Sequence, residues 1–312
     1  MGKKLAVVGL YGMSALFRLD RLPMPGETAG SRALKFEQGG KGYNQALGAL
    51  RMGTEVFFAT AVGDDFYGKQ APAVFEQDGL KDYRCMVISD TPTAFASVLS
   101  DRTGANMVIV EQGASAKLTL DMADRLEDRI KDCDMLLLQC EMPDAIIKRL
   151  LETGKKHGLL TVLNPAPARC SVRELMPLCD LVTPNWGEAQ TITGMYHASV
   201  PAVAEELVSY SHGAVVITLG KDGSYVQEPG HAGYFQKAVQ VDSVDTTGAG
   251  DNFNGVLCAR LLAGDSLHHA VSFANVSSGL SVTKYGVIEA IPTLKEVEEF
   301  MIQIKERDHK KN

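Results

Sequence analysis

Short runs of apolar residues, separated by helical patterns, constrain the fold of this chain more than any other feature. A continuous apolar run of a few residues is typical of a strand buried on both faces of a parallel sheet. Between the runs, apolar residues recur at the spacing of amphipathic helices. The runs lie at 5–10, 55–62, 135–140, 159–164, 181–183 and 215–219, and the helical patterns at 122–130, 146–151 and 294–304. The alternation predicts an α/β fold, with a mostly parallel central sheet layered between helices.

Two segments break this alternation and carry hairpin signals. Residues 17–36 include Pro23-Met24-Pro25-Gly26, and residues 94–110 indicate two strands around a turn at 101–104. We expect both to join in a small β-sheet lid over the carboxyl ends of the main strands, where open α/β sheets bind ligands. Ordinary loops with hairpins are the alternative. With their flanks, the lid segments cover approximately 11–38 and 92–111 within a single domain of residues 1–312.

Charge and composition exclude several classes of function. The formal net charge is −7, with 22% charged and 45% hydrophobic residues, which is unfavourable for a dedicated nucleic-acid binder. No apolar run approaches the ~20 residues of a membrane span. The six cysteines form no CxxC pair and no zinc-like spacing, so reduced thiols are expected. These features predict a cytoplasmic protein without nucleic-acid or membrane partners.

The segment 245–254, Asp-Thr-Thr-Gly-Ala-Gly-Asp-Asn-Phe-Asn, carries the strongest chemical signal. Its small-residue turn leads into an apolar helical stretch, where main-chain N–H groups and the helix dipole attract an anion. N–H groups from Gly248 to Asp251 would stabilise a transferred phosphoryl group while Asp251 takes the proton of an acceptor hydroxyl. The pattern indicates ATP-dependent phosphorylation of an alcohol. Taken alone, it fits equally a helix N-terminus with an acidic first turn.

A second glycine turn, Gly39-Gly40-Lys41-Gly42-Tyr43-Asn44, leads into a helical run at 46–50. Such a turn can bring N–H groups, an amide and a lysine to a polyhydroxylated substrate or its incoming phosphate. It is not a P-loop, because Gly42 follows the lysine and the spacing differs. A left-handed turn with a surface lysine is the alternative.

Two strand ends carry further polar turns. Asn185 can reach a phosphate and Glu188 can hold Mg²⁺ through water, although Asn followed by Glu at this spacing is also the usual capping box. The strand ending at Thr218 runs into Gly220 and Gly223, which can admit an adenine ring or simply form a tight turn.

Taken together, these segments resemble the ribokinase-like (PfkB) carbohydrate kinases along almost the whole chain, and the ribokinase branch most closely. Two long motifs in the right order, about 200 residues apart, carry the resemblance. They are Gly39-Gly40-Lys41-Gly42-x-Asn44-Gln45-Ala46 and Asp245-x-Thr247-Gly248-Ala249-Gly250-Asp251-x-Phe253-x-Gly255. Shorter segments at 25–28, 164–168 and 183–189 are similar to ribokinases in particular.

The resemblance implies a role for each matching residue. Asp251 would be the general base, and the N–H groups of Gly248, Ala249 and Gly250 would form the anion hole. Around ATP it implies Asn185, Thr218, Gly220, Gly223 and Asn275, with Glu188 acting on Mg²⁺ through water. At the sugar it implies Gly12, Ser14, Gly40, Lys41, Asn44, Glu141 and Asp251.

The resemblance also implies a monovalent cation, K⁺, beside the anion hole, and a homodimer formed through the lid. The cation would be held by Asp245 and Thr247 with groups at Ser281, Lys284 and Gly286. Ala290 stands where ribokinases have a serine, which removes one oxygen and favours weaker cation binding.

The departures from the family pattern concern mainly the acceptor. Ribokinases carry an Asn and an Asp where this chain has Gly12 and Ser14. Each lost hydrogen bond to a buried sugar hydroxyl typically costs ~1–3 kcal/mol. This argues against D-ribose as the preferred acceptor. Gly12 is expected to add room, so a deoxypentose, a modified sugar, or a nucleoside with Tyr11 or Met13 near its base becomes an alternative.

The sequence thus predicts a phosphotransferase with an alcohol group as acceptor, which passes the γ-phosphate of ATP to a primary hydroxyl of a pentose-like sugar. A nucleoside kinase on the same fold is one alternative. A regulator that binds a sugar or nucleotide without catalysis is the other; the intact Asp251 counts against it.

Overall fold

The computed structural model describes residues 2–102 and 106–311, so part of the predicted turn at 101–104 lies outside the described residues. Within them, a nine-stranded sheet has the order β13-β12-β11-β10-β9-β8-β1-β4-β5. Neighbouring strands from β5 to β11 are parallel, whereas β12 and β13 are antiparallel. The strands are β1 (Lys4–Val8), β4 (Glu55–Gly63), β5 (Asp82–Ile88), β8 (Met135–Gln139), β9 (Leu160–Asn164), β10 (Leu181–Val182), β11 (Ala214–Thr218), β12 (Ser224–Gln227) and β13 (Tyr234–Gln236). The predicted α/β fold with a mostly parallel central sheet is confirmed.

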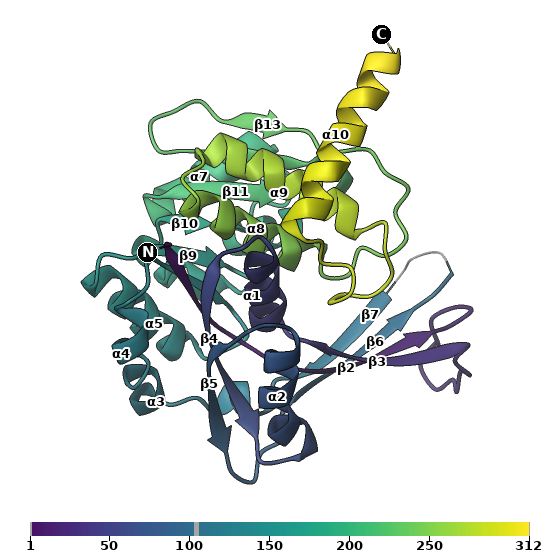
Figure 1. The fold of residues 1–312 in the computed structure, drawn as a ribbon, viewed down its shortest axis with the longest axis vertical. Coiled ribbons are helices and arrows are strands. Elements are labelled where there is room, and N and C mark those ends of the chain that lie inside the picture. The colour runs from purple at the N-terminus through teal and green to yellow at the C-terminus, as the bar shows by residue number, and fades with distance from the viewer. Residues whose placement is uncertain (1, 103–105, 312) are drawn as a thin grey trace.

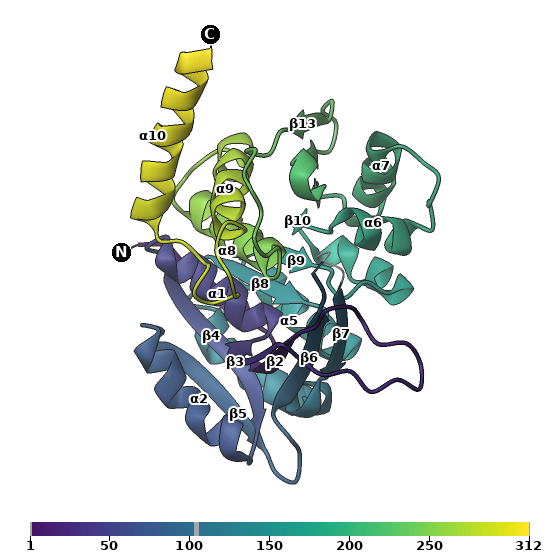
Figure 2. The same cartoon turned by 90° about the vertical axis from the view of Figure 1, so that its right-hand side faces the viewer.

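Helices cover both faces of this sheet, because its inner strands are apolar on both (Figures 1 and 2). In β1, Leu5 and Val7 belong to one hydrophobic cluster and Ala6 and Val8 to the other. The first cluster receives side chains from α1 (Lys41–Arg51), α2 (Phe66–Gln77), α8 (Ala249–Leu262), α9 (Leu267–Ser281) and α10 (Leu294–Lys311). The second receives them from α3 (Leu120–Asp124), α4 (Glu127–Ile130), α5 (Asp144–Lys156), α6 (Trp186–Thr193) and α7 (Val200–Ser211).

A second, four-stranded sheet projects from the main body (Figure 1). Its order is β3-β2-β6-β7, with β2 and β6 parallel and the other pairs antiparallel. The strands are β2 (Gly12–Arg18), β3 (Ala33–Gly39), β6 (Ala94–Ser100) and β7 (Asn106–Glu111). The two hairpin-like segments therefore do join in one small sheet. Strands β2 and β3 extend beyond the 17–36 pattern, and the proline-containing stretch between them is a loop.

The described helices include none that is both long and apolar enough to cross a membrane. The cysteines in the described residues are all free; Cys170 is exposed and Cys85 half-buried, whereas the other four are buried.

Candidate active site

The start of α8 is shaped by Gly248, which has a φ of 77°. An ideal Cβ at this position would overlap Val287, so both the backbone conformation and the space require glycine. The first N–H groups of a helix have no acceptor within it. Asn252 N donates to Gly248 O at 2.9 Å, and Ala249 N reaches only Thr246 O, at 3.3 Å. The helix therefore presents its positive end at the predicted anion hole.

Asp251, in the first turn of α8, is buried and receives one amide hydrogen bond on each carboxylate oxygen. Asn44 Nδ2 donates to Oδ2 at 2.9 Å, and Gln45 Nε2 donates to Oδ1 at 3.0 Å. Gln45 is itself held by Asn164 Oδ1, at 3.0 Å, and by Gln139 Nε2, at 2.8 Å. Neutral amides thus fix the orientation of the carboxylate and leave it lone pairs for an acceptor hydroxyl.

Close packing of α1 against α8 brings these amides to Asp251. An ideal Cβ at Gly255 would overlap the carbonyl oxygen of Gln45, and it would lie 2.9 Å from Ala49 N. The glycine therefore lets the two helix backbones approach, and residues 44 and 45 of α1 face the first turn of α8 as a result.

Cavity A lies between the second sheet and the main body. It is lined by all of the residues predicted at the sugar: Gly12, Ser14, Gly40, Lys41, Asn44, Glu141 and Asp251. Glu141 Oε2 accepts a hydrogen bond from Lys41 N at 3.0 Å. Burial raises the pKa of Glu141 to about 7 against the opposing charge of Lys41, while Asp251 raises the pKa of Lys41. Asn44 Oδ1 is buried without a hydrogen-bond partner in the described residues.

Two sequence expectations about cavity A are wrong. Gly12 adds no room, because an ideal Cβ there would overlap the carbonyl oxygen of Ala94 on the adjacent strand β6. Tyr11 is not available to a nucleoside base, because it is 1% exposed and packs edge-on against Tyr43 and Phe75. Met13 does line the cavity.

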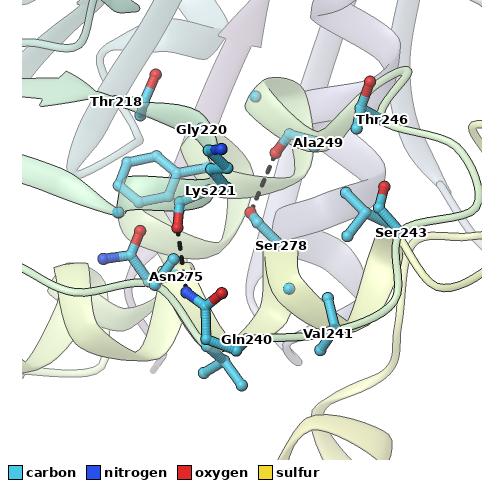
Figure 3. A pocket seen from close by; sticks show the side chains of 17 residues that line it. Thr218, Gly220, Lys221, Gln240, Val241, Ser243, Thr246, Ala249, Asn275 and Ser278 are labelled. Carbon is cyan, nitrogen blue, oxygen red and sulfur yellow. Dashed lines mark hydrogen bonds between the residues drawn. The ribbon is translucent and has the colours of Figure 1, made fainter. Parts of the chain in front are cut away.

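Cavity B lies on the other side of α8 and contains Thr218, Gly220, Gly223 and Asn275, four of the residues predicted at ATP. Figure 3 shows Thr218 and Lys221 on one side of this cavity and Ser243 and Thr246 on the other. The turn between β11 and β12 is tight, as the alternative interpretation of this segment proposed, and Gly223 has a φ of 99°. The lining residues include four glycines, two alanines, three valines and Phe253, which suits a flat apolar ring. The valines are Val239, Val241 and Val282.

Cavity C connects cavities A and B. It shares Lys41 and Asp251 with cavity A, and Thr218 and Gly250 with cavity B. The three cavities therefore form a continuous lining past the start of α8. Asp251 lines the part of this surface where a ligand in cavity B would meet a ligand in cavity A.

Asn185 and Glu188 form the capping box of α6 and also line cavity C, so their predicted role at phosphate and Mg²⁺ stays a prediction. Asn185 Oδ1 accepts from Glu188 N at 2.9 Å, and Glu188 Oε2 accepts from Asn185 N at 2.8 Å. Burial raises the pKa of Glu188. The described residues contain no cluster of three or more His, Cys, Asp or Glu side chains that could hold a metal.

Asp245 ties together the two segments predicted around the monovalent cation. Its Oδ1 accepts from Thr247 N at 2.9 Å, and its Oδ2 accepts from Gly286 N at 3.3 Å. Lys284 N donates to Ser281 O, whereas Lys284 Nζ donates to Glu296. The Lys284 side chain is thus engaged by Glu296, and it is the backbone of this segment that can face a cation.

The sequence reasoning missed Gln45, Gln139 and Asn164 as the support of Asp251, and it missed Glu37, which also lines cavity A. Gln139 and Asn164 are the last residues of β8 and β9. A polar residue that closes an apolar strand on the ligand-binding edge was a usable signal for both.

Comparison with known proteins identifies the family of this chain. The model of the pfkB family carbohydrate kinases matches residues 3–294. The chain belongs to this family. It is 34% identical over 304 residues to a ribokinase of Haemophilus influenzae, covering 96% of this chain and 99% of the relative. It is 29% identical over 304 residues to a deoxyribokinase of Salmonella typhimurium, covering 95% and 98%.

The chain is also similar to a solved ribokinase structure. The ribokinase of Arabidopsis thaliana, complexed with ribose and ATP, superposes with a TM-score of 0.84 at 28% identity, covering 96% of this chain and 99% of that one. The protein is thus an ATP-dependent sugar kinase with a ribokinase-like fold, which confirms the family resemblance seen in the sequence.

Proposed function

We propose that this kinase transfers the γ-phosphate of ATP to a primary hydroxyl of a pentose-like sugar, with Asp251 as general base. The observation that carries the proposal is the position of Asp251, which lines both cavity A and the connecting cavity C. A sugar in cavity A and a triphosphate reaching from cavity B would meet at its carboxylate.

In this mechanism Asp251 takes the proton of the primary hydroxyl, and the resulting oxygen attacks the γ-phosphorus as the bond to ADP breaks. Asn44 and Gln45 hold the carboxylate in place during the transfer. The N–H groups of Gly248, Ala249 and Gly250 at the positive end of α8 stabilise the charge on the transferred phosphoryl oxygens.

Two ions accompany this proposal. Glu188 in cavity C would hold Mg²⁺ through water together with phosphate oxygens of ATP, and Mg²⁺ would neutralise phosphate charge. A monovalent cation such as K⁺ would face Asp245, Thr247 and the backbone at Ser281, Lys284 and Gly286. The hydrogen bonds that Asp245 accepts from both segments support this assignment.

The acceptor follows from cavity A. Relatives named ribokinase and deoxyribokinase both support a pentose-like sugar. Ser14 supplies only a hydroxyl and Gly12 no side chain, so we propose that D-ribose is held by fewer hydrogen bonds from β2 than an Asn and Asp pair would provide.

We also propose that the kinase is a cytoplasmic homodimer paired through the second sheet, which acts as a lid. Six large apolar residues of this sheet are exposed: Leu34, Phe36, Met107, Val108, Ile109 and Val110. Such a surface suits burial against a second copy. A dimeric mass in light scattering at micromolar concentration supports this, and a monomeric mass contradicts it.

The deciding experiment measures ADP release with Mg·ATP and K⁺ for a panel of pentoses, deoxypentoses, hexoses and nucleosides. Asp251→Asn is expected to lower kcat on the order of 10²- to 10⁴-fold while ATP still binds. Turnover of Asp251→Asn near the wild-type rate would remove Asp251 as the base. Binding of ATP by the wild type without transfer to any acceptor would favour a regulator, and preference for nucleosides over free sugars would favour a nucleoside kinase.

A further inference from the structure

Glu37 on β3 has an unusual environment for a carboxylate. It lines cavity A but is only 5% exposed. Its Oε1 accepts two backbone hydrogen bonds, from Val287 N at 2.7 Å and from Ile288 N at 2.8 Å. One oxygen of Glu37 therefore fixes the second sheet to the loop that follows Gly286.

The other oxygen, Oε2, is buried and has no hydrogen-bond partner in the described part of the chain. Lys35 Nζ lies 3.5 Å away but makes its hydrogen bond to Glu289 Oε2, at 3.0 Å, on the exposed side. Buried carboxylate oxygens are nearly always hydrogen-bonded, because losing water without a replacement is costly. Oε2 therefore has an ion-pair contact with Lys35 but no hydrogen bond, and a ligand that brings a donor could supply one.

The strand register shows where such a ligand lies. Ser14 and Glu37 are paired residues on β2 and β3, so their side chains project from the same face of the second sheet. Both line cavity A together with Asp251. A ligand in this cavity therefore lies beside the side chains of Glu37 and Ser14, on the same side of the sheet.

We propose that Glu37 Oε2 accepts a hydrogen bond from a hydroxyl of the acceptor sugar, other than the one that is phosphorylated, and thereby sets which sugar is preferred. This inference rests on the proposed function of cavity A.

The charges around cavity A define the chemical class of this acceptor. Three carboxyl groups line it, on Glu37, Glu141 and Asp251, and Lys41 is the lysine among its lining residues. With Lys35 Nζ 3.5 Å from Glu37, the carboxyl groups outnumber the two nearby lysines, which favours a neutral sugar over one that carries a phosphate or carboxylate. The acceptor is therefore a neutral sugar with a free hydroxyl directed at β3.

The test compares wild type and Glu37→Gln on a neutral sugar and on its monodeoxy analogues, each lacking one hydroxyl other than the phosphorylated one. Gln keeps a carbonyl oxygen for Val287 N and Ile288 N but replaces the unpaired oxygen with an NH₂ group. In the wild type, loss of one particular hydroxyl should lower kcat/KM by about 10- to 100-fold. In Glu37→Gln that penalty should shrink to about twofold, with the KM for ATP unchanged.

Glu37→Ala provides the second measurement and Glu289→Gln the matched control. Glu37→Ala removes the loop contacts as well, so it should slow every acceptor and yet also lose the hydroxyl-specific penalty. Glu289 is the exposed partner of Lys35, outside cavity A, and its substitution should leave the acceptor preference unchanged.

Three outcomes would overturn the proposal. If Glu37→Gln lowers kcat/KM by the same factor for every acceptor, Glu37 is only a tether for the loop. If Glu37→Gln changes nothing, the unpaired oxygen has no ligand. If the wild type phosphorylates no sugar at all, the proposed function fails, and this inference fails with it.

Discussion

Around Asp251 each carboxylate oxygen receives an amide hydrogen bond, whereas across cavity A one oxygen of the Glu37 carboxylate has no hydrogen bond in the described residues and only an ion-pair contact with Lys35. The first group is held by residues of the main body, on α1, β8 and β9. The second stands on the small sheet and is tied to the main body through one loop. Under the proposed function, this difference means that the geometry of the reaction is fixed before substrate arrives, while the choice of acceptor is left to groups that the substrate must satisfy.

Gly255→Ala tests the fixed arrangement around Asp251 and has the largest expected effect. The added Cβ would overlap Gln45 O and separate α1 from α8, which displaces the amides from Asp251. We expect kcat to fall about 10- to 100-fold and the free energy of unfolding to fall by about 1–3 kcal/mol. Steady-state kinetics and urea unfolding measure the two effects.

Gly250→Ala is the matched control for stability, because an ideal Cβ there meets no atom within 4 Å. Equal free energies of unfolding for the two variants would show that α1 and α8 do not need the close approach at Gly255.

Glu141→Gln tests a further buried carboxyl group of cavity A through the pH dependence of stability. Burial raises the pKa of Glu141 from 4.5 to about 7, so between these values the folded protein binds a proton that the unfolded chain releases. The stability from the protonated form is present below pH 4.5 and is lost as the pH rises through 7. Glu141→Gln should therefore exceed wild type by about 1–3 kcal/mol in free energy of unfolding at pH 8 and match it near pH 4.5. A difference independent of pH in chemical unfolding would contradict this.

Ser14→Asp tests the second sheet and has the smallest expected effect. It places a carboxylate opposite Glu37 on the paired strand, and like charges at such positions cost about 0.2–1 kcal/mol. Ser14→Asn, of nearly the same size, is the neutral control. Ser14→Asp should therefore have a lower midpoint of thermal unfolding than Ser14→Asn at neutral pH. Identical midpoints would mean that the carboxylates at positions 14 and 37 do not repel each other.

The sequence predicted the inner strands because they are continuous apolar runs. It missed β5, β12 and β13, which lie at the two ends of the sheet order. The residues of β5 are partly exposed, so its pattern resembles neither a buried strand nor a clean alternation. The helical pattern at 122–130 divides into the short helices α3 and α4.

In the site, residues beside small-residue turns were predictable, because a glycine-rich turn that leads into an apolar helix is a distinctive local pattern. Glu37 was not, because a glutamate in a partly polar strand carries no local signal. Only the pairing with Ser14 and the contact with a loop 250 positions later reveal it. Gly12 was misinterpreted for the same reason: the atom that fills its space belongs to Ala94.

The amide chain that supports Asp251 has a direction. A carboxylate only accepts hydrogen bonds, so Gln45 must turn its NH₂ group toward Asp251 and its oxygen toward Gln139, whose own NH₂ group then faces Gln45. The buried oxygen left over is Gln139 Oε1, which has no partner in the described residues. Two acceptors, Asp251 Oδ1 and Asn164 Oδ1, thus set the orientation of Gln45, and Gln45 in turn sets the orientation of Gln139 at the end of β8.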